Sequence, residues 1–479
     1  MSSKLLALFI LTLSSISYAH GDLPPSLTGP AALETALRKL PTTVSVLHIV
    51  AHPDDEDAGT ITYLARGLGA RTMLLSLTRG EGGANVISSD FFDALGALRT
   101  LETRKACDAY GVELFFTRAA DYGYSKSVEE AQEKWDIDML VRDTVRVIRR
   151  ERPDIILSRF RGDRRDGHGH HTLSGIVSKL AYEAAADPKK YPEQIAEGLE
   201  PWEVKKLYTG NLRPQWRKDD EELISVSVDS GAYDPVFGAS CYQIGRYGYA
   251  FHRSQGMSFS VGSPGPKLSH YRLVDHRIED YSPGREGTIL GGLTIGHSGL
   301  AEDAGFSLIS DAFLQLDEKI KALDVDHKNP AASGEAIAEC LGLARKIIYA
   351  LHDSSEADSH EGERALRIVR ETEGELVEVL RLALGLHFEA EARRVGVEGG
   401  RRSRRAPLRR VSPADSFEIR TRFFNRSHAP VSDGAPVVEV PDGWKQTLVS
   451  EPAGDKFYLQ LNDSSEAVFR VEVAPTATS

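Results

Sequence analysis

Between residues 44 and 186 the sequence alternates short apolar segments with longer amphipathic ones, and this alternation restricts the folds that the chain can adopt. The short segments are rich in β-branched and aromatic residues, as is typical of strands buried on both faces. They span residues 44–52, 71–80, 112–118 and 154–160. The amphipathic segments have the apolar spacing of helices, over residues 57–69, 93–110, 127–151 and 170–186. The pattern predicts an α/β domain with a Rossmann-like, doubly wound and mostly parallel sheet.

The patterning changes further along the chain, and four regions follow from it. The α/β domain occupies residues 43–300, and residues 301–394 have the apolar spacing of a helical region. The glycine-containing basic run at 395–411 is typical of a linker. Residues 412–479 alternate with period two, which predicts a β-sandwich-like domain. Only about four or five strands fit there, against about seven in an immunoglobulin-like sandwich, so this domain is either small or incomplete.

Residues 1–19 have the three parts of a secretory signal peptide. Lys4 provides the positive charge, residues 5–16 form an apolar run, and residues 17–19 (Ser-Tyr-Ala) form a small-x-small cleavage site. The apolar run is shorter than the ~20 residues that cross a bilayer. We therefore expect an exported protein, periplasmic or extracellular, with no integral membrane segment after signal removal. The alternative is a retained N-terminal anchor or a buried helix.

The charge balance and the cysteine content exclude two classes of protein. The 479 residues include 58 Lys and Arg against 70 Asp and Glu, for a net charge of −12. Nucleic-acid binding depends largely on Lys and Arg contacts to phosphate, so we expect no nucleic-acid partner. The three cysteines include no C-x-x-C pair and are too few for a disulfide framework.

The first predicted strand ends in a histidine that is followed by acidic residues. The run is His52, Pro53, Asp54, Asp55, Glu56 and Asp57. In a doubly wound sheet the ligand binds beyond the carboxyl ends of the strands, so this run lies at the expected active edge. Acidic residues also favour the first turn of a helix. That interpretation accounts for Glu56 and Asp57, but for neither the histidine nor the proline.

A second group of histidines follows the fourth predicted strand, at the same edge of the sheet. His168, His170 and His171 lie in a glycine-containing loop. Catalytic zinc sites use three nitrogen or oxygen ligands and leave a fourth position for water. His52, Asp55 and one of the later histidines would complete such a set, so the sequence predicts Zn²⁺ as the cofactor.

Four motifs occur in a fixed order along the chain. They are AHPDDE (51–56), LTRGEGG (77–83), Arg99-x-x-Glu102 and GHGHH (167–171). In this order they resemble the LmbE-like, or PIG-L, family of zinc-dependent N-acetylglucosaminyl deacetylases, over residues 44–260. The resemblance implies a zinc-dependent hydrolase that deacetylates N-acetylated amino sugars or related glycoconjugates, by attack of a metal-activated water on the amide.

The resemblance also implies a role for each residue of the two histidine motifs. His52, Asp55 and His171 would bind the metal. Asp54 would be the general base, and a carboxylate that is not itself a ligand suits this role because it can take the proton of the attacking water. His168 would stabilise the oxyanion or protonate the leaving amine.

The chain departs from the family's HxDH pattern at the third position, which is His170. The acid that would orient a neighbouring imidazole is therefore missing. Asp163 or Asp166 is the candidate replacement, as a hydrogen-bond acceptor behind a ligand. His170 itself is an alternative metal ligand.

The two intermediate motifs have two interpretations each. Arg79 and Glu81 either line the sugar pocket, with Gly82 allowing close approach of the backbone, or form an ion pair in a structural turn. Arg99 and Glu102 are spaced as a surface pair on one helix face. The resemblance implies instead that Arg99 contacts the substrate.

An alternative function is a catalytically weak carbohydrate-binding or scaffolding protein on the same fold. In that case the C-terminal β-domain would contact a glycan, and the altered HxDH motif would have weakened catalysis. The fold alone does not separate the two functions. The presence of all three expected ligands and of the expected base favours the hydrolase, because a decayed site loses ligands as readily as outer residues.

Overall fold

The computed structural model describes residues 29–259, 262–307, 309–353, 359–395, 408, 410–432, 438–450 and 458–475. The chain divides into two compact units, and helices α10 and α12 cross the division. The first unit is Met1–Asp317 with Ser359–Ile368, and the second is Glu318–Asp358 with Val369–Ser479. The predicted signal peptide, 1–19, lies outside the described residues, as does most of the predicted linker.

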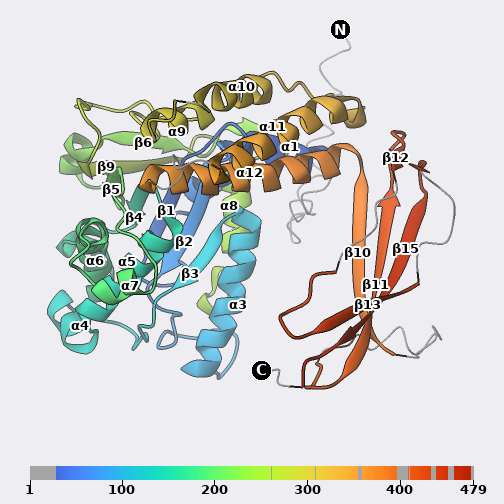
Figure 1. Cartoon of the computed structure of the whole chain (residues 1–479). Coiled ribbons are helices and arrows are strands. Elements are labelled where there is room, and N and C mark those ends of the chain that lie inside the picture. The colour runs from blue at the N-terminus through green and yellow to red at the C-terminus, as the bar shows by residue number, and fades with distance from the viewer. Residues whose placement is uncertain are drawn as a thin grey trace, which may run out of the picture. The chain divides into compact units, whose positions relative to one another are not determined.

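The first unit contains a seven-stranded sheet of order β3-β2-β1-β4-β5-β9-β6 (Figure 1). Its strands are β1 (Ser45–Val50), β2 (Arg71–Ser76), β3 (Glu113–Phe116), β4 (Ile155–Ser158), β5 (Lys206–Thr209), β6 (Val226–Asp229) and β9 (Leu268–His276). The first five strands pair in parallel, whereas β9 is antiparallel to β5 and β6 is antiparallel to β9. The predicted α/β domain with a mostly parallel sheet is confirmed, and the four strands predicted from apolar runs are β1 to β4.

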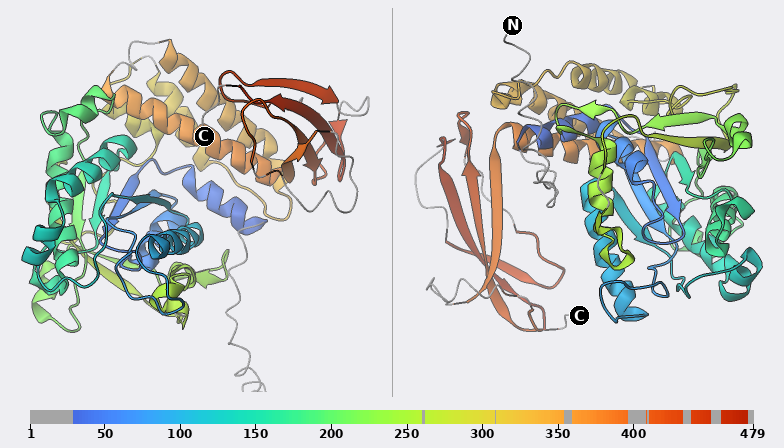
Figure 2. Two further views of the ribbon diagram at one scale, coloured as in Figure 1. Left: turned by 90° about the horizontal axis from the view of Figure 1, so that it is seen from below. Right: turned by 180° about the vertical axis from the view of Figure 1, so that it is seen from behind.

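Helices cover both faces of this sheet (Figures 1 and 2). Alternate residues of β1 point to opposite faces, because successive side chains in a strand do so. Leu47 and Ile49 pack with helices α5 and α6, whereas Val50 packs with α2 and α3. The helices of this unit are α1 (Pro30–Lys39), α2 (Ala58–Thr62), α3 (Asp93–Tyr110), α4 (Val128–Lys134), α5 (Ile137–Glu151), α6 (Gly169–Ala186), α7 (Pro192–Ala196), α8 (Cys241–Tyr249) and α9 (His297–Asp303). A strand ribbon also occurs, formed by β7 (Tyr233–Asp234) and β8 (Ala239–Ser240).

Two predicted helices differ from the observed ones, and local hydrogen bonding explains one difference. The predicted helix at 127–151 is two helices, because Ser127 caps α4 and Asp136 caps α5. Each cap accepts a hydrogen bond from a backbone N–H that the helix itself leaves free. The predicted helix at 57–69 is α2 followed by a π-helical turn, Tyr63–Gly67.

The remaining elements are helices α10 to α12 and a C-terminal sheet. The helices are α10 (Ser310–Lys321), α11 (Gly334–His352) and α12 (His360–Ala383). The sheet is antiparallel, of order β10-β11-β15-β13, formed by β10 (Leu386–Arg394), β11 (Ser416–Asn425), β13 (Lys445–Ser450) and β15 (Ser464–Glu472). A separate ribbon pairs β12 (Val431–Ser432) with β14 (Tyr458–Leu459). In the described part of the chain the predicted sandwich is thus one four-stranded sheet and one ribbon.

The helical region predicted over 301–394 extends beyond the last observed helix. Helix α12 stops at Ala383, and Gly385 has a φ of 60°, which breaks the helix. The residues after it form β10, which pairs with β11 from Leu386 opposite Asn425. Among the described residues, no helix is both long and apolar enough to span a membrane.

A buried carboxylate, Asp317, holds the start of α9. It accepts hydrogen bonds from the backbone N–H groups of His297 and Ser298, at 2.8 Å each, and from both side chains. Burial alone would raise the pKa of Asp317, but these hydrogen bonds outweigh it and hold the pKa well below its usual range. The ionised carboxylate therefore stabilises the fold above the pKa of an unfolded aspartate.

Asp317→Asn is expected to lower the free energy of unfolding at pH 7 by about 2 kcal/mol, the size of hydrogen bonds to a charged group. Because the folded pKa is depressed, the wild-type protein loses this contribution as the pH falls below about 4, and the difference from the variant shrinks there. Urea unfolding at pH 7 and at pH 3.5 measures both effects. Glu318→Gln, an exposed change on the same helix, is the control. A difference that does not depend on pH would contradict this account.

Candidate metal centre

The first histidine motif forms the turn after β1. Every residue of β1 is buried, and the strand leads directly to His52 at its carboxyl end. The backbone N–H of His52 donates to Asp55 Oδ2 at 2.8 Å, which closes the turn. Asp54 has a φ of 89°, a left-handed conformation that costs energy for a residue other than glycine.

The structure brings the three predicted metal ligands together. The carboxylate of Asp55 lies between two imidazoles, with Oδ2 at 3.1 Å from His52 Nδ1 and Oδ1 at 3.2 Å from His171 Nε2. The potential ligand atoms of these residues all lie within 4.8 Å of one another. His52 follows β1 and His171 lies in the first turn of α6, just beyond β4, the parallel neighbour of β1. Two imidazole nitrogens and a carboxylate oxygen form a donor set that suits Zn²⁺.

His171 is held in place by a main-chain carbonyl. Its Nδ1 donates to the carbonyl oxygen of Asp166 at 3.3 Å, and its ring stacks on Phe160 with 4.1 Å between ring centres. This leaves Nε2 free to face Asp55. A hydrogen bond to the second ring nitrogen fixes the tautomer of a histidine ligand, as metal sites require.

Neither acid that was predicted to orient an imidazole does so with its carboxylate. The buried carboxylate of Asp166 accepts from three backbone N–H groups of its own loop and from Asn211 Nδ2. The exposed carboxylate of Asp163 accepts from the N–H of Arg165, at 2.8 Å, and caps a short 3-10 helix. Both carboxylates form hydrogen bonds within their own loop. The group that orients the His171 ring is the main-chain carbonyl of Asp166.

His170 occupies the position of the missing acid and faces His52. Its Nδ1 lies 3.0 Å from His52 Nε2, and its fully buried ring stacks on Trp135 at 3.8 Å. His52 can donate through Nε2 to this nitrogen while Nδ1 faces Asp55. His52, His168 and His170 also form a group whose potential ligand atoms lie within 4.8 Å. That group contains no carboxylate and would use the nitrogen of His52 that bonds to His170.

His168 caps helix α6 and faces a neighbouring loop. Its Nδ1 accepts from the N–H of His170, and its Nε2 lies 3.2 Å from the backbone N of Ser125. A neutral imidazole has a single acceptor nitrogen, so only one of these two hydrogen bonds forms at a time. Burial, and then the charges of His171 and His52, lower the pKa of His168 to about 4. When Nδ1 accepts in the cap the proton is on Nε2, and when Nε2 accepts from Ser125 the proton is on Nδ1.

Asp54, the predicted base, adjoins the predicted metal ligands in the sequence and in the structure. Its side chain is half-buried, and burial, followed by the charges of Asp55 and Glu56, raises its pKa to about 7. The strained turn is held from outside the motif. Tyr249 Oη donates to the carbonyl of Asp54 at 2.8 Å, and Gln255 Nε2 donates to the carbonyl of Pro53 at 2.6 Å.

Glu56 fixes the same turn from within the motif. Its Oε2 accepts from the N–H of Asp54 at 2.9 Å. Its Oε1 accepts from Tyr110 Oη at 2.8 Å and pairs with His252 Nε2 at 2.7 Å. All of these side chains except that of Asp54 are buried. His252 and Gln255 lie in one short segment, 252–255, and neither was among the site residues predicted from the sequence.

Gln255→Ala is expected to lower kcat about tenfold, because loss of a supporting hydrogen bond lets the strained turn relax and moves Asp54. Steady-state kinetics measure the change, and Gln215→Ala, at an exposed position, is the control. A lower melting temperature with kcat unchanged would show that Gln255 serves stability alone.

The predicted substrate-binding residues, Arg79, Glu81 and Arg99, form hydrogen bonds within the protein. Arg99 is buried and donates to the carbonyls of Gly80, at 2.6 Å, and Ala84, at 2.7 Å. Arg79 donates to the carbonyl of Thr117. Glu81 accepts from the N–H of Arg79 and from that of Asp121, each at 3.1 Å.

These contacts correct the surface-pair interpretation of Arg99 and Glu102. Arg99 is buried rather than on a solvated helix face, and it shapes the loop after β2. Its contact with a substrate stays a prediction. Glu102, which was expected to pair with it on the surface, is buried and accepts from the N–H and Oγ of Ser254. Glu81 ties two loops together through backbone groups, which fits the structural-turn interpretation.

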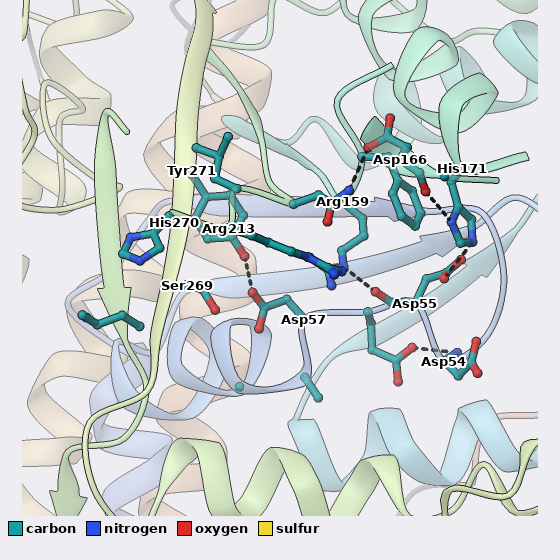
Figure 3. Close-up of a pocket in the computed structure, with 18 of the residues that line it drawn as sticks. Asp54, Asp55, Asp57, Arg159, Asp166, His171, Arg213, Ser269, His270 and Tyr271 are labelled. Carbon is teal, nitrogen blue, oxygen red and sulfur yellow. Dashed lines mark hydrogen bonds and ion pairs between the residues drawn. The ribbon is translucent and has the colours of Figure 1, made fainter. Parts of the chain in front are cut away.

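A cavity of about 580 Å³ opens beside the metal centre. Its size is in the range of small-molecule sites. Figure 3 shows Asp54, Asp55 and His171 at one end and Ser269, His270 and Tyr271 at the other. A substrate in this cavity would therefore lie within reach of the base and of two of the ligands.

Comparison with known proteins yields one matching family, described as PIG-L, GlcNAc-PI de-N-acetylase, over residues 47–185. This region contains both histidine motifs. A 1D-myo-inositol 2-acetamido-2-deoxy-alpha-D-glucopyranoside deacetylase from Geodermatophilus obscurus is 32% identical over 279 residues, which cover 48% of this chain and 91% of the relative. A protein of the same name from Thermobispora bispora is 34% identical over 196 residues, which cover 37% of this chain and 63% of the relative.

Among solved structures, the N,N'-diacetylchitobiose deacetylase from Pyrococcus horikoshii is similar to this chain with a TM-score of 0.37. It is 16% identical, and the alignment covers 48% of this chain and 83% of that one.

Proposed function

The chain belongs to the PIG-L, or LmbE-like, family, and from this premise we propose that it is a zinc-dependent deacetylase that hydrolyses the acetamide of an N-acetylated amino sugar or a related glycoconjugate. One observation carries the proposal: Asp54, a carboxylate outside the ligand set, adjoins the converging side chains of His52, Asp55 and His171, and Asp54, Asp55 and His171 line one cavity.

The metal site fits the proposed chemistry. His52 Nδ1, the carboxylate of Asp55 and His171 Nε2 would hold Zn²⁺, which supplies an activated water and polarises the amide carbonyl when it is bound. His170 and the carbonyl of Asp166 hold the remaining nitrogens of the two imidazoles. These contacts orient the two imidazoles in the metal-free protein.

The protein's own groups would then move the protons. Asp54 accepts a proton from the attacking water, as a base with a pKa near the working pH does efficiently, and passes it to the leaving amine. In the tautomer that has Nδ1 in the helix cap, His168 would donate from Nε2 to the oxyanion of the tetrahedral intermediate. The raised pKa of Asp54 supports the first role, and the cap that holds Nδ1 of His168 supports the second.

The relatives narrow the proposed substrate. Those from Geodermatophilus obscurus and Thermobispora bispora are named for an acetamido sugar linked to inositol. We therefore propose an N-acetylglucosamine conjugate as the substrate class. Export to the periplasm or the cell exterior also stays a proposal, since it depends on the sequence of residues 1–19 alone.

The alternative, a catalytically weak binding or scaffolding protein, is not favoured, because the ligand set and the base are both in place. The matched family region ends at residue 185, so the glycan contact predicted for the C-terminal sheet stays a prediction.

The test is the release of acetate and free amine by the purified full chain. N-acetylglucosamine linked to inositol, N,N'-diacetylchitobiose and an N-acetylated amino acid are compared as substrates. We expect acetate and amine in a ratio of one to one from at least one of the two sugars and none from the amino acid. Hydrolysis of the amino acid alone would move the function to another class of amide, and binding of the sugars without release would favour the binding protein.

A further inference from the structure

The cavity beside the metal centre is rich in arginine. Five guanidinium-bearing side chains line it: Arg159, Arg165, Arg213, Arg217 and Arg246. They come from three separate parts of the chain, the segment after β4, the loop after β5 and helix α8. The contacts of each arginine show which of these cations already bond to other groups of the protein.

Three of the five arginines bond to protein groups. Arg159 Nε donates to the carbonyl of Asp55 at 2.7 Å. Arg165 pairs with Asp219 at 2.6 Å. Arg217 donates through both terminal nitrogens to the carbonyl of Arg165. These side chains build the wall of the cavity.

Arg213 differs from these three. Within the described ranges its guanidinium has neither an ion pair nor a hydrogen bond, and its contact is the ring of Trp216, whose centre lies 5.2 Å away. The carboxylate of Asp220, in the same loop, already accepts hydrogen bonds from other groups. Its Oδ2 accepts from the backbone N–H of Arg213 and its Oδ1 from Arg161 Nη1.

The surroundings of Arg213 are positively charged. Arg213 is exposed, and desolvation, followed by the charges of Arg159 and Arg217, lowers its pKa. In Figure 3 Arg159 and Arg213 lie between the Asp55–His171 pair and the Tyr271–Asp57 pair. An anion placed beside Arg213 would relieve this repulsion.

Arg246 is the second arginine of the cavity whose guanidinium forms neither an ion pair nor a hydrogen bond with another described residue. It is half-buried on α8, and its guanidinium lies over the ring of Tyr249, 4.3 Å from the ring centre. Tyr249 is also the residue that holds the Asp54 turn. The second free cation is thus one helical turn from a residue that contacts the base.

Among the described residues, no carboxylate of the cavity, that of Asp54 included, forms an ion pair or a hydrogen bond with either arginine. Asp57 accepts from Tyr271 Oη at 2.8 Å and from the N–H of Thr60. Glu56 is paired with His252, and Asp166 is used by its own loop. Asp55 faces the imidazoles of the metal centre.

We propose that this cavity binds a negatively charged group of the substrate, a carboxylate or a phosphate, through Arg213 and Arg246. The planar fork of a guanidinium matches both groups, and such charge-assisted hydrogen bonds are among the stronger ones in proteins. The enzyme then acts on N-acetylated amino sugars that carry an anionic group. This inference rests on the proposed function and specifies its substrate class.

The test compares kcat/KM for N-acetylglucosamine, N-acetylglucosamine 6-phosphate and N-acetylmuramic acid. We expect the wild-type protein to prefer at least one charged sugar over the neutral one by about tenfold or more. The two charged sugars separate a phosphate site from a carboxylate site. The preference should fall toward one in Arg213→Gln and in Arg246→Gln. It should persist in Lys218→Gln, which removes one positive charge from the same loop outside the cavity.

Equal kcat/KM for neutral and charged sugars in the wild-type protein would overturn the proposal, as would an unchanged preference in both arginine variants. If none of these three sugars is hydrolysed, binding of inorganic phosphate decides the anion site, and acetate release from the conjugates named above decides the proposed function separately. Calorimetry on metal-free full-length protein should detect phosphate binding that Arg213→Gln weakens by about tenfold. Absence of binding to the wild-type protein, or equal binding to both, would overturn the proposal.

Discussion

Asp54→Asn is expected to lower kcat by about two to four orders of magnitude while bound zinc stays at the wild-type level. The amide has nearly the shape of the carboxylate but cannot accept the proton of the attacking water. Asn is preferred to Ala as the replacement because the φ of 89° at this position suits asparagine better than most residues. Steady-state acetate release and elemental mass spectrometry measure the two quantities.

The matched control for this variant is Asp163→Asn. It makes the same chemical change at an exposed carboxylate of the second motif, and asparagine retains the helix cap there. We expect its kcat to stay within about twofold of wild type, since surface substitutions away from special features have small effects. Retained activity in Asp54→Asn would remove Asp54 from the role of base.

The second large effect is expected from loss of a metal ligand. His52→Ala and His171→Ala should each reduce bound zinc to less than about a tenth of an equivalent per chain and abolish turnover. Catalytic zinc sites have three protein ligands, and even the loss of an outer hydrogen-bond partner typically costs about 10- to 100-fold in affinity or activity. Elemental mass spectrometry after dialysis against a fixed zinc concentration measures the loss.

Two further histidine variants make this result specific. His168→Ala should lower kcat and retain the metal, because His168 lies outside the carboxylate-containing ligand set. His387→Ala removes an imidazole of β10, which pairs with Glu389, and should change neither quantity. Loss of metal in His168→Ala with retention in His171→Ala would mean that the two histidines have exchanged roles.

The sequence predicts the centre of the fold well because β1 to β4 carry a recognisable signal. Strands covered on both faces are nearly continuous in apolar character, as β1, β2 and β4 are, and the edge strand β3 retains the apolar run Leu114–Phe116. Strand β9 lacks that signal, because it alternates exposed and half-buried residues with a single buried one, Tyr271. The two antiparallel strands, β9 and β6, were therefore not predicted from the sequence.

The metal centre was predictable because a parallel sheet gathers the ends of neighbouring strands. His52 follows β1 and His171 follows β4, and these two strands pair directly. The supporting residues were not predictable in the same way. Arg99 bonds to carbonyl groups of the loop after β2, and Gln255 bonds to Pro53 from about 200 positions away in the sequence. Main-chain acceptors leave no mark on residue type, so the sequence contains no signal for such contacts.

The most direct test of the account is acetate release by the purified full chain before chelation, after chelation and after the return of one equivalent of zinc. Hydrolysis should disappear when the metal is removed and return when zinc is supplied, and His52→Ala should show none at any stage. Acetate release that survives complete removal of the metal would contradict the assignment of His52, Asp55 and His171 as the centre of a zinc-dependent deacetylase.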